Sequence, residues 1–224
     1  MCGRYTVSAP ADELAELFGL SEMPGFDPRW NAAPTQRLPV VRADEAGTRR
    51  MALLRWGLVP SWADDPSIGS RMINARAETL AAKPAFRAAL RRRRCLVPAT
   101  GFYEWTGEKG AKRAWLFRRA DGRAFAFAGL WETWTPRTGG EPLETFSIVT
   151  TAADDLVRPV HDRMPAIVAR ADFAAWLDPG TDPGTRLGSL LRPAGDPNMV
   201  RVAVGPAVND PRRDEPGCAV PVAE

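Results

Sequence analysis

The sequence has few of the residues from which metal sites and disulfide frameworks are built. Its 224 residues include only three cysteines and one histidine. The cysteines, Cys2, Cys95 and Cys218, are odd in number and none stands at Cys-x-x-Cys spacing, so a disulfide framework is not expected. A Cys3His zinc site would need all three together with His161, although the four are far apart without paired spacing. We therefore expect no metal and no other cofactor.

Long hydrophobic runs are also missing. No apolar stretch reaches the length of a membrane-spanning helix, and the first residues lack the apolar segment of a signal peptide. These features predict a cytoplasmic protein with no membrane partner. The chain is 45% hydrophobic, enough for a normal core, and its length suits one domain over residues 1–224. A net charge of only +3 permits a nucleic-acid partner without requiring one.

Strand and helix patterns are mixed along the chain. The segment 8–18 predicts a helix with Ser8 as its N-cap, the segment 83–94 predicts a second, and 153–160 a short third. Strands are expected at 38–42, at the start of 51–62, where the strand runs into a loop, at 95–105, at 144–153 and within 198–208. The segment 113–134 predicts a hairpin that turns at Asp121 and Gly122. Because βαβ periodicity is missing, we expect an α+β fold with a mainly antiparallel sheet, and a surface loop over 181–197.

Cys2 stands directly behind the initiator methionine, in the stretch MCGRYTV. If Met1 is removed, one residue carries both a free amine and a thiol. An α-amine has a pKa of about 7.7–8.0 against about 10.4 for lysine, so far more of it is neutral near pH 7. A neutral amine adds to aldehydes, and a 1,2-aminothiol then closes a thiazolidine ring. The alternatives are an N-terminal nucleophile hydrolase and a small buried cysteine without chemistry.

Three polar residues are further candidates for chemistry. Asn74 offers a donor and an acceptor within INARAET, or it simply opens a capped helix. Glu104 lies between aromatic residues in GFYEW, where burial would raise its pKa, although a carboxylate at a strand end often faces water. His161 is the only histidine and a natural acid or base, although a lone histidine is more often structural.

Arginine and tryptophan supply the candidates for binding. The run of four arginines at 91–94 predicts the solvated end of a helix. Such a run adds only a general attraction for phosphate. Trp56 and Trp62 flank a loop suited to stacking on bases, and for Trp56 a buried anchor is the favoured interpretation. Arg76 carries a guanidinium fork suited to phosphate.

Six stretches together resemble one known family, the SOS response-associated peptidase (SRAP) family, and its bacterial members in particular. They occur in the family's order from Met1 to about Pro165, and a weaker match follows at VGPAVNDPR. The stretches are MCGRYT at the start, WNAAPTQ at 30–36, WGLVPSW at 56–62, INARAET at 73–79, PATGFYEW at 98–105 and VTTAADDLVRPVHDRMP at 149–165.

The resemblance implies a fold, an activity and a site. Family members have a barrel-like sheet with short flanking helices. They sense abasic sites in single-stranded DNA at stalled forks and form a thiazolidine crosslink through the N-terminal cysteine, after removing their own Met1. The family's catalytic positions fall on Cys2, Asn74, Glu104 and His161. Its DNA-contacting surface matches Arg4, Asn31, Trp62 and Arg76.

The resemblance also implies a single-stranded DNA partner, a monomer, association with the nucleoid and no metal. A Schiff-base intermediate permits weak lyase activity at the lesion. Two rival functions stay open. One is a thiol peptidase that acts on other proteins, with Cys2 as nucleophile and His161 as base. The other is a non-covalent binder of single strands that uses tryptophan and arginine alone.

Overall fold

The computed structural model describes residues 2–44, 46–108, 111–181, 185–193 and 196–223. Five of its strands close into a ring, because β10 pairs with β4, β4 with β3, β3 with β6, β6 with β9, and β9 again with β10. All these pairings are antiparallel except β10 with β4. The ring strands are β3 (Arg37–Ala43), β4 (Arg49–Trp56), β6 (Arg94–Ala99), β9 (Phe125–Trp134) and β10 (Leu143–Ala152).

Three short strands extend this barrel. The strand β5 lies parallel to β10, β11 pairs with β10 and β12 with β9. A separate five-stranded sheet has the order β13-β8-β7-β1-β2. These strands are β1 (Tyr5–Val7), β2 (Arg29–Ala32), β5 (Asn74–Arg76), β7 (Gly101–Thr106), β8 (Arg113–Arg119), β11 (Arg163–Pro165), β12 (Ile167–Val168) and β13 (Met199–Val204). The fold is α+β with a barrel-like, mainly antiparallel sheet, as predicted.

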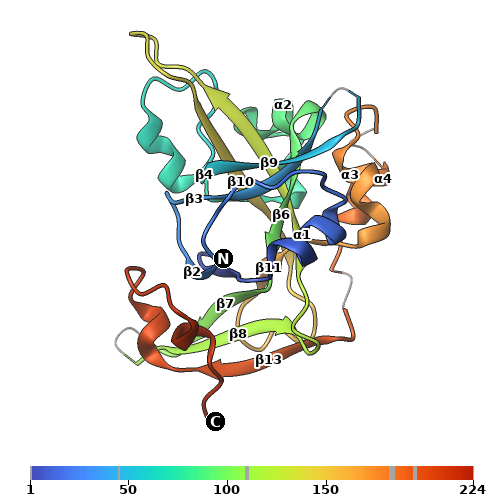
Figure 1. Ribbon diagram of the computed structural model, residues 1–224. Helices are drawn as coiled ribbons and strands as arrows, with labels where there is room; N and C mark the ends of the chain where they lie inside the picture. Colours follow the sequence, from blue (N-terminus) through green and yellow to red (C-terminus); the bar gives the residue numbers. More distant parts are fainter. Residues whose placement is uncertain (1, 45, 109–110, 182–184, 194–195, 224) are drawn as a thin grey trace.

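Short helices flank the sheets, with the barrel in the upper part of Figure 1 and the five-stranded sheet in the lower part. The α-helices are α1 (Ala11–Phe18), α2 (Pro84–Arg92), α3 (Phe173–Leu177) and α4 (Thr185–Leu190). The 3-10 helices are η1 (Pro66–Arg71), η2 (Ala77–Thr79), η3 (Arg170–Asp172), η4 (Pro206–Asn209) and η5 (Pro216–Ala219). None of the helices in the described ranges is long and apolar enough to span a membrane.

Aromatic side chains join the two sheets. Tyr5 of β1 packs edge-on against Trp56 of β4 and Phe127 of β9, with ring centroids 5.3 and 5.9 Å apart. Phe102 of β7 meets Phe127 at 6.1 Å in the same way. All four side chains are fully buried. Edge-to-face contacts between buried rings contribute about 0.5–1.5 kcal/mol each beyond the area they bury, so this cluster fixes β1 against the barrel.

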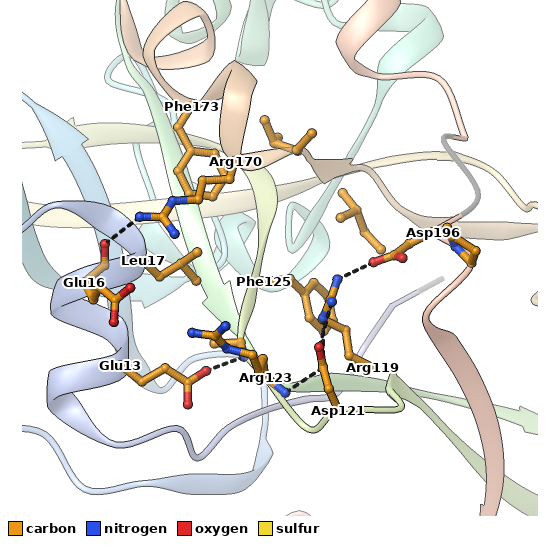
Figure 2. Close-up of a pocket in the computed structure, with 15 residues that line it drawn as sticks. Glu13, Glu16, Leu17, Arg119, Asp121, Arg123, Phe125, Arg170, Phe173 and Asp196 are labelled. Carbon is orange, nitrogen blue, oxygen red and sulfur yellow. Dashed lines mark hydrogen bonds and ion pairs between the residues drawn. The ribbon is translucent and has the colours of Figure 1, made fainter.

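The prediction of a hairpin over 113–134 is wrong, although both predicted strands are present. β8 pairs with β7 and β13, whereas β9 pairs within the barrel. The turn redirects the chain because the Arg119 guanidinium holds Asp121 through two hydrogen bonds of 3.0 and 2.8 Å, and Gly122 has a φ of 71°. A second ion pair from Arg119 to Asp196 ties this corner to the segment before β13, and Figure 2 shows both on the wall of a cavity of about 470 Å³.

Three smaller predictions also need correction. Ser8 does not cap α1: the helix follows Pro10, and the Ser8 hydroxyl lies 3.2 Å from that of Thr100. The segment 153–160 forms turns rather than a helix, and the expected loop over 181–197 contains α4. Gly19 ends α1 in the left-handed conformation, with a φ of 65°.

The arginine run is not a uniform solvated face. Arg91 and Arg92 are exposed, but Arg94 begins β6 and is 3% exposed. Its guanidinium donates to the carbonyls of Trp176 and Leu90 at 2.5 Å and also to that of Asp178. Burial lowers the pKa of Arg94. Arg94 therefore fastens the end of α2 and the end of α3 to the barrel.

We expect Arg94→Met to lower the free energy of unfolding by about 3 kcal/mol, because it leaves buried carbonyls without donors. Urea unfolding followed by circular dichroism measures this change. Arg91→Met is the matched control, since Arg91 is exposed, and should stay within about 0.5 kcal/mol. If the two substitutions changed the free energy of unfolding equally, the hydrogen bonds of Arg94 would not stabilise the fold.

Candidate active site

Cys2 lies where the two sheets meet, just before β1, and its side chain is fully buried. The N-terminal end of the chain reaches this junction between barrel and lower sheet in Figure 1. The Cys2 sulfur is 3.7 Å from the backbone carbonyl of Arg4. Burial raises the pKa of the Cys2 thiol, and the nearby Glu104 carboxylate raises it further. In this arrangement the sulfur is a thiol at neutral pH.

Asn74 approaches Cys2 from the barrel side. It begins β5, and its amide nitrogen donates to the Cys2 carbonyl at 2.8 Å. The preceding residue, Ile73, is held by two bonds to its carbonyl, one from the Trp56 indole at 2.8 Å and one from the Ile148 backbone at 3.0 Å. Asn74 Oδ1 is buried and has no hydrogen-bond partner among the described residues. The amide thus fixes the Cys2 backbone and keeps one acceptor available.

Glu104 comes from the five-stranded sheet. It lies in β7 opposite Trp115 and is 4% exposed. Burial raises the pKa of its carboxyl, while the charge of His161 acts in the opposite direction. A buried carboxyl with a raised pKa keeps its proton to a higher pH than a carboxyl in water, which favours a role as a proton carrier.

His161 precedes β11 and is about one quarter exposed. Its Nδ1 accepts the backbone N–H of Arg163 at 2.9 Å and lies 3.0 Å from a carboxylate oxygen of Asp162. A backbone N–H can only donate, so the neutral ring carries its proton on Nε2. The Asp162 side chain is 86% exposed and is solvated, so we take the backbone bond to fix the tautomer.

The structure thus brings the four predicted catalytic residues to one region. The Cys2 carbonyl accepts a hydrogen bond from Asn74, the Glu104 carboxylate raises the pKa of the Cys2 thiol, and the charge of His161 lowers the pKa of Glu104. They come from both sheets, across about 160 positions of sequence. The arrangement offers an acid or base, an imidazole with a fixed tautomer and an amide around one sulfur, and their roles stay predictions.

The four predicted DNA contacts lie in different settings. Trp62 is 53% exposed in the loop after β4, and Arg76 is exposed at the end of β5. Arg4 is half-buried, and its Nη1 donates to Asn31 Oδ1 and to the Val208 carbonyl, both at 2.8 Å. The Trp56 side chain is buried, as expected of an anchor.

Asn31 is fully buried, which sequence reasoning did not foresee. Its amide donates to three carbonyls of the C-terminal segment, those of Val208, Asp210 and Arg213, at 3.2, 3.0 and 2.7 Å. In this conformation Asn31 holds that segment against β2. Its contact with DNA remains a prediction.

One ion pair beside the site was missed from the sequence. Arg163 binds Glu78 through both guanidinium ends, at 2.6 and 3.0 Å, and donates to the Thr150 carbonyl at 2.6 Å. The pair ties η2, which follows Asn74 and Arg76, to β11, which follows His161. Both residues lie inside motifs, INARAET and VHDRMP, but nothing in one sequence shows that charges 85 positions apart meet.

This cysteine-centred site on a barrel-and-sheet fold defines the class of protein. The chain belongs to the SRAP family, because the family model "SOS response associated peptidase (SRAP)" matches residues 1–211.

Similar proteins agree with this assignment. The abasic site processing protein YoqW of Bacillus subtilis is 40% identical over 96% of this chain and 97% of its own. The abasic site processing protein HMCES of Gallus gallus is 32% identical over 99% of this chain and 78% of its own. A crystal structure of a Bacteroides thetaiotaomicron protein matches with a TM-score of 0.88 at 27% identity, covering 99% of this chain and all of that one.

We expect Glu104→Gln to raise the free energy of unfolding at neutral pH. The folded-state pKa of Glu104 is raised, so its ionised form costs stability above the unfolded-state pKa of about 4.3. Below that pH both states are protonated and the cost vanishes. Urea unfolding across pH should therefore show the wild type and the variant converging at acid pH and diverging toward neutrality.

Glu78→Gln is the matched contrast, because its hydrogen bond with Arg163 lowers the pKa of Glu78. That variant should lose stability at neutral pH, and the difference should shrink as the pH falls through the folded-state pKa. If Glu104→Gln instead lost stability at neutral pH, the favourable interactions of the ionised Glu104 carboxylate would be larger than the cost of burying its charge.

Proposed function

We propose that this protein senses abasic sites in single-stranded DNA and protects them by a covalent crosslink through Cys2. The observation that supports it most is the burial of Cys2 among Asn74, Glu104 and His161. The family assignment and the relatives named abasic site processing proteins support the same function. The proposal includes loss of Met1 by the protein's own activity, which frees the amine of Cys2.

The proposed reaction begins on the open-chain aldehyde of the abasic sugar. The Cys2 amine adds to C1′ and forms a carbinolamine, which loses water to give a Schiff base. The nitrogen of this Schiff base is protonated, the Cys2 sulfur adds to the same carbon, and the thiol gives up its proton, so that one proton is taken up and one is released. One water leaves for each thiazolidine formed. Since the buried sulfur holds its proton at neutral pH, the positive Schiff base is what draws the thiol into reaction.

Each neighbouring residue has one proposed part. Glu104, with its raised pKa, takes a proton from the amine or gives one to the departing hydroxyl. His161, with Nε2 carrying its proton, gives that proton to the sugar ring oxygen as the ring opens. The free acceptor of Asn74 receives an N–H of the amine or a sugar hydroxyl. Arg4, Arg76 and Trp62 contact the flanking strand, and Asn31 supports Arg4.

Crosslinking is tested by denaturing electrophoresis of the purified protein with single-stranded DNA that carries one abasic site. We expect a shifted band that survives denaturant, needs the abasic site and is lost in Cys2→Ala. Cys95→Ala is the matched control, because Cys95 is equally buried, and should crosslink like the wild type. Intact-mass analysis reports whether Met1 has been removed.

No band from protein shown to lack Met1 would reject the crosslinker. Binding that survives without any covalent product would favour the non-covalent binder, and cleavage of protein substrates without DNA would favour the thiol peptidase. Cys2→Ser keeps the amine, so it should give an adduct that cyanoborohydride traps. Its absence would argue against the Schiff base and the weak lyase activity that follows from it.

Glu104→Gln should slow crosslinking far more than it weakens DNA binding. Loss of a positioned acid or base typically costs about 10²–10⁴-fold in rate. Single-turnover gel assays give the rate, and fluorescence anisotropy gives the affinity for the same DNA. Crosslinking at the wild-type rate would remove Glu104 from the mechanism.

A further inference from the structure

A second cavity, of about 510 Å³, lies at one end of the barrel. It is bounded by the end of β3, the start of β4, the end of α2, the start of β6 and Trp131 of β9. Most of its polar lining is arginine, which the proposed function does not use. The arginines are Arg42, Arg50, Arg92, Arg93 and Arg94.

This arginine cavity is separate from the Cys2 site. The β3–β4 ladder pairs Arg37 with Arg55 at one end and Arg42 with Arg50 toward the other. The first end adjoins the Cys2 site, because Trp56 follows Arg55 and donates to the carbonyl beside Asn74. Arg42 is five residues further along β3, which is roughly 17 Å at ~3.4 Å per residue.

Three of the five arginines are fixed by neighbours. Arg42 lies over the Trp131 ring with 4.6 Å to its centroid and binds Glu144. Arg93 binds Glu132 at 2.7 Å, and Arg94 is turned inward to backbone carbonyls. Guanidinium groups held on an indole and by carboxylates lose little freedom when a ligand arrives.

The other two arginines face solvent. Arg50 is 64% exposed and lies 3.4 Å from Asp44, while Arg92 is exposed and makes no hydrogen bond or ion pair with its side chain among the described residues. Five guanidinium charges thus meet four carboxylates: those of Asp44, Glu132 and Glu144, and that of Asp178, whose charge acts on Arg94. The net charge around the cavity is therefore positive.

We propose that the arginine cavity binds phosphate groups, with Arg50 and Arg92 as the direct contacts and Arg42 as the fixed floor. Forked arginine donors match phosphate oxygens, and a cavity of this volume admits a ligand of nucleotide size. The phosphate belongs either to a free nucleotide or to the DNA strand beyond the lesion. The site needs no chemistry at Cys2, so its test stands apart from that of crosslinking.

The test compares Arg50→Gln/Arg92→Gln with Arg87→Gln/Arg192→Gln, which removes the same charge from exposed arginines outside the cavity. Calorimetry with sodium pyrophosphate measures the site alone. Anisotropy with oligonucleotides of about six and about thirty nucleotides distinguishes the source, since only a long strand reaches a second site. Crosslinking of the short oligonucleotide and thermal unfolding confirm that both variants are folded.

We expect the cavity variant to bind pyrophosphate at least fivefold more weakly than the wild type, and the control variant to be unchanged. A matching loss for the long oligonucleotide alone would identify the DNA strand as the source, and its absence would identify a free nucleotide. Undetectable pyrophosphate binding by the wild type, or equal losses in both variants, would overturn the proposal and leave only a solvated basic surface.

Discussion

The hydrogen bond from the Asn74 amide to the Cys2 carbonyl joins the two parts of the molecule at the place where chemistry is proposed. Asn74 belongs to the barrel and Cys2 leads into the five-stranded sheet. The bond can form only because β1 is held against the barrel by the ring of Tyr5, packed on Trp56. Since Trp56 also holds the carbonyl beside Asn74, one buried indole supports both partners of the bond.

The setting of the sulfur follows from the same packing. A cysteine at a chain terminus is ordinarily solvated, yet Cys2 is fully buried beside a carboxyl that is itself 4% exposed. Burial raises the pKa of both groups and so keeps them in their neutral forms more than water would. Burial therefore disfavours negative charge on Cys2 and Glu104 before a substrate binds. In the proposed reaction, the positive charge of the Schiff base that forms on the Cys2 amine would then have two buried groups beside it.

Much of the fold was predictable from local sequence, and the rest depended on long-range pairing. The strands β3, β4, β6, β9 and β13 and the helix α2 were expected near their observed positions, because alternation and helical periodicity are local signals. The turn at Gly122 was also expected, but not the separation of β8 from β9 into different sheets. A turn signal fixes where the chain reverses and says nothing of which strand each side pairs with.

The candidate site shows the same division. Motifs indicated Cys2, Asn74, Glu104 and His161, and the fold brings them to one region. The inward direction of Arg94 and the burial of Asn31 were not predictable, because each depends on carbonyls about 80 to 180 positions away. In one sequence, a polar residue that serves the backbone of a distant segment looks the same as one that serves a ligand.

The Arg4 guanidinium donates to the carbonyl of Val208, a partner 204 positions further along the chain. Asn31 makes its own bonds to the same C-terminal segment. Contacts between such distant positions carry the largest loop-closure entropy and depend on nearly the whole chain being available. During synthesis, β1 can pair with β2 and β7 before these side-chain contacts form, because the contacts require the segment around Val208. The hydrogen bonds from Arg4 and Asn31 to the C-terminal segment are therefore among the last contacts of the N-terminal strands to form.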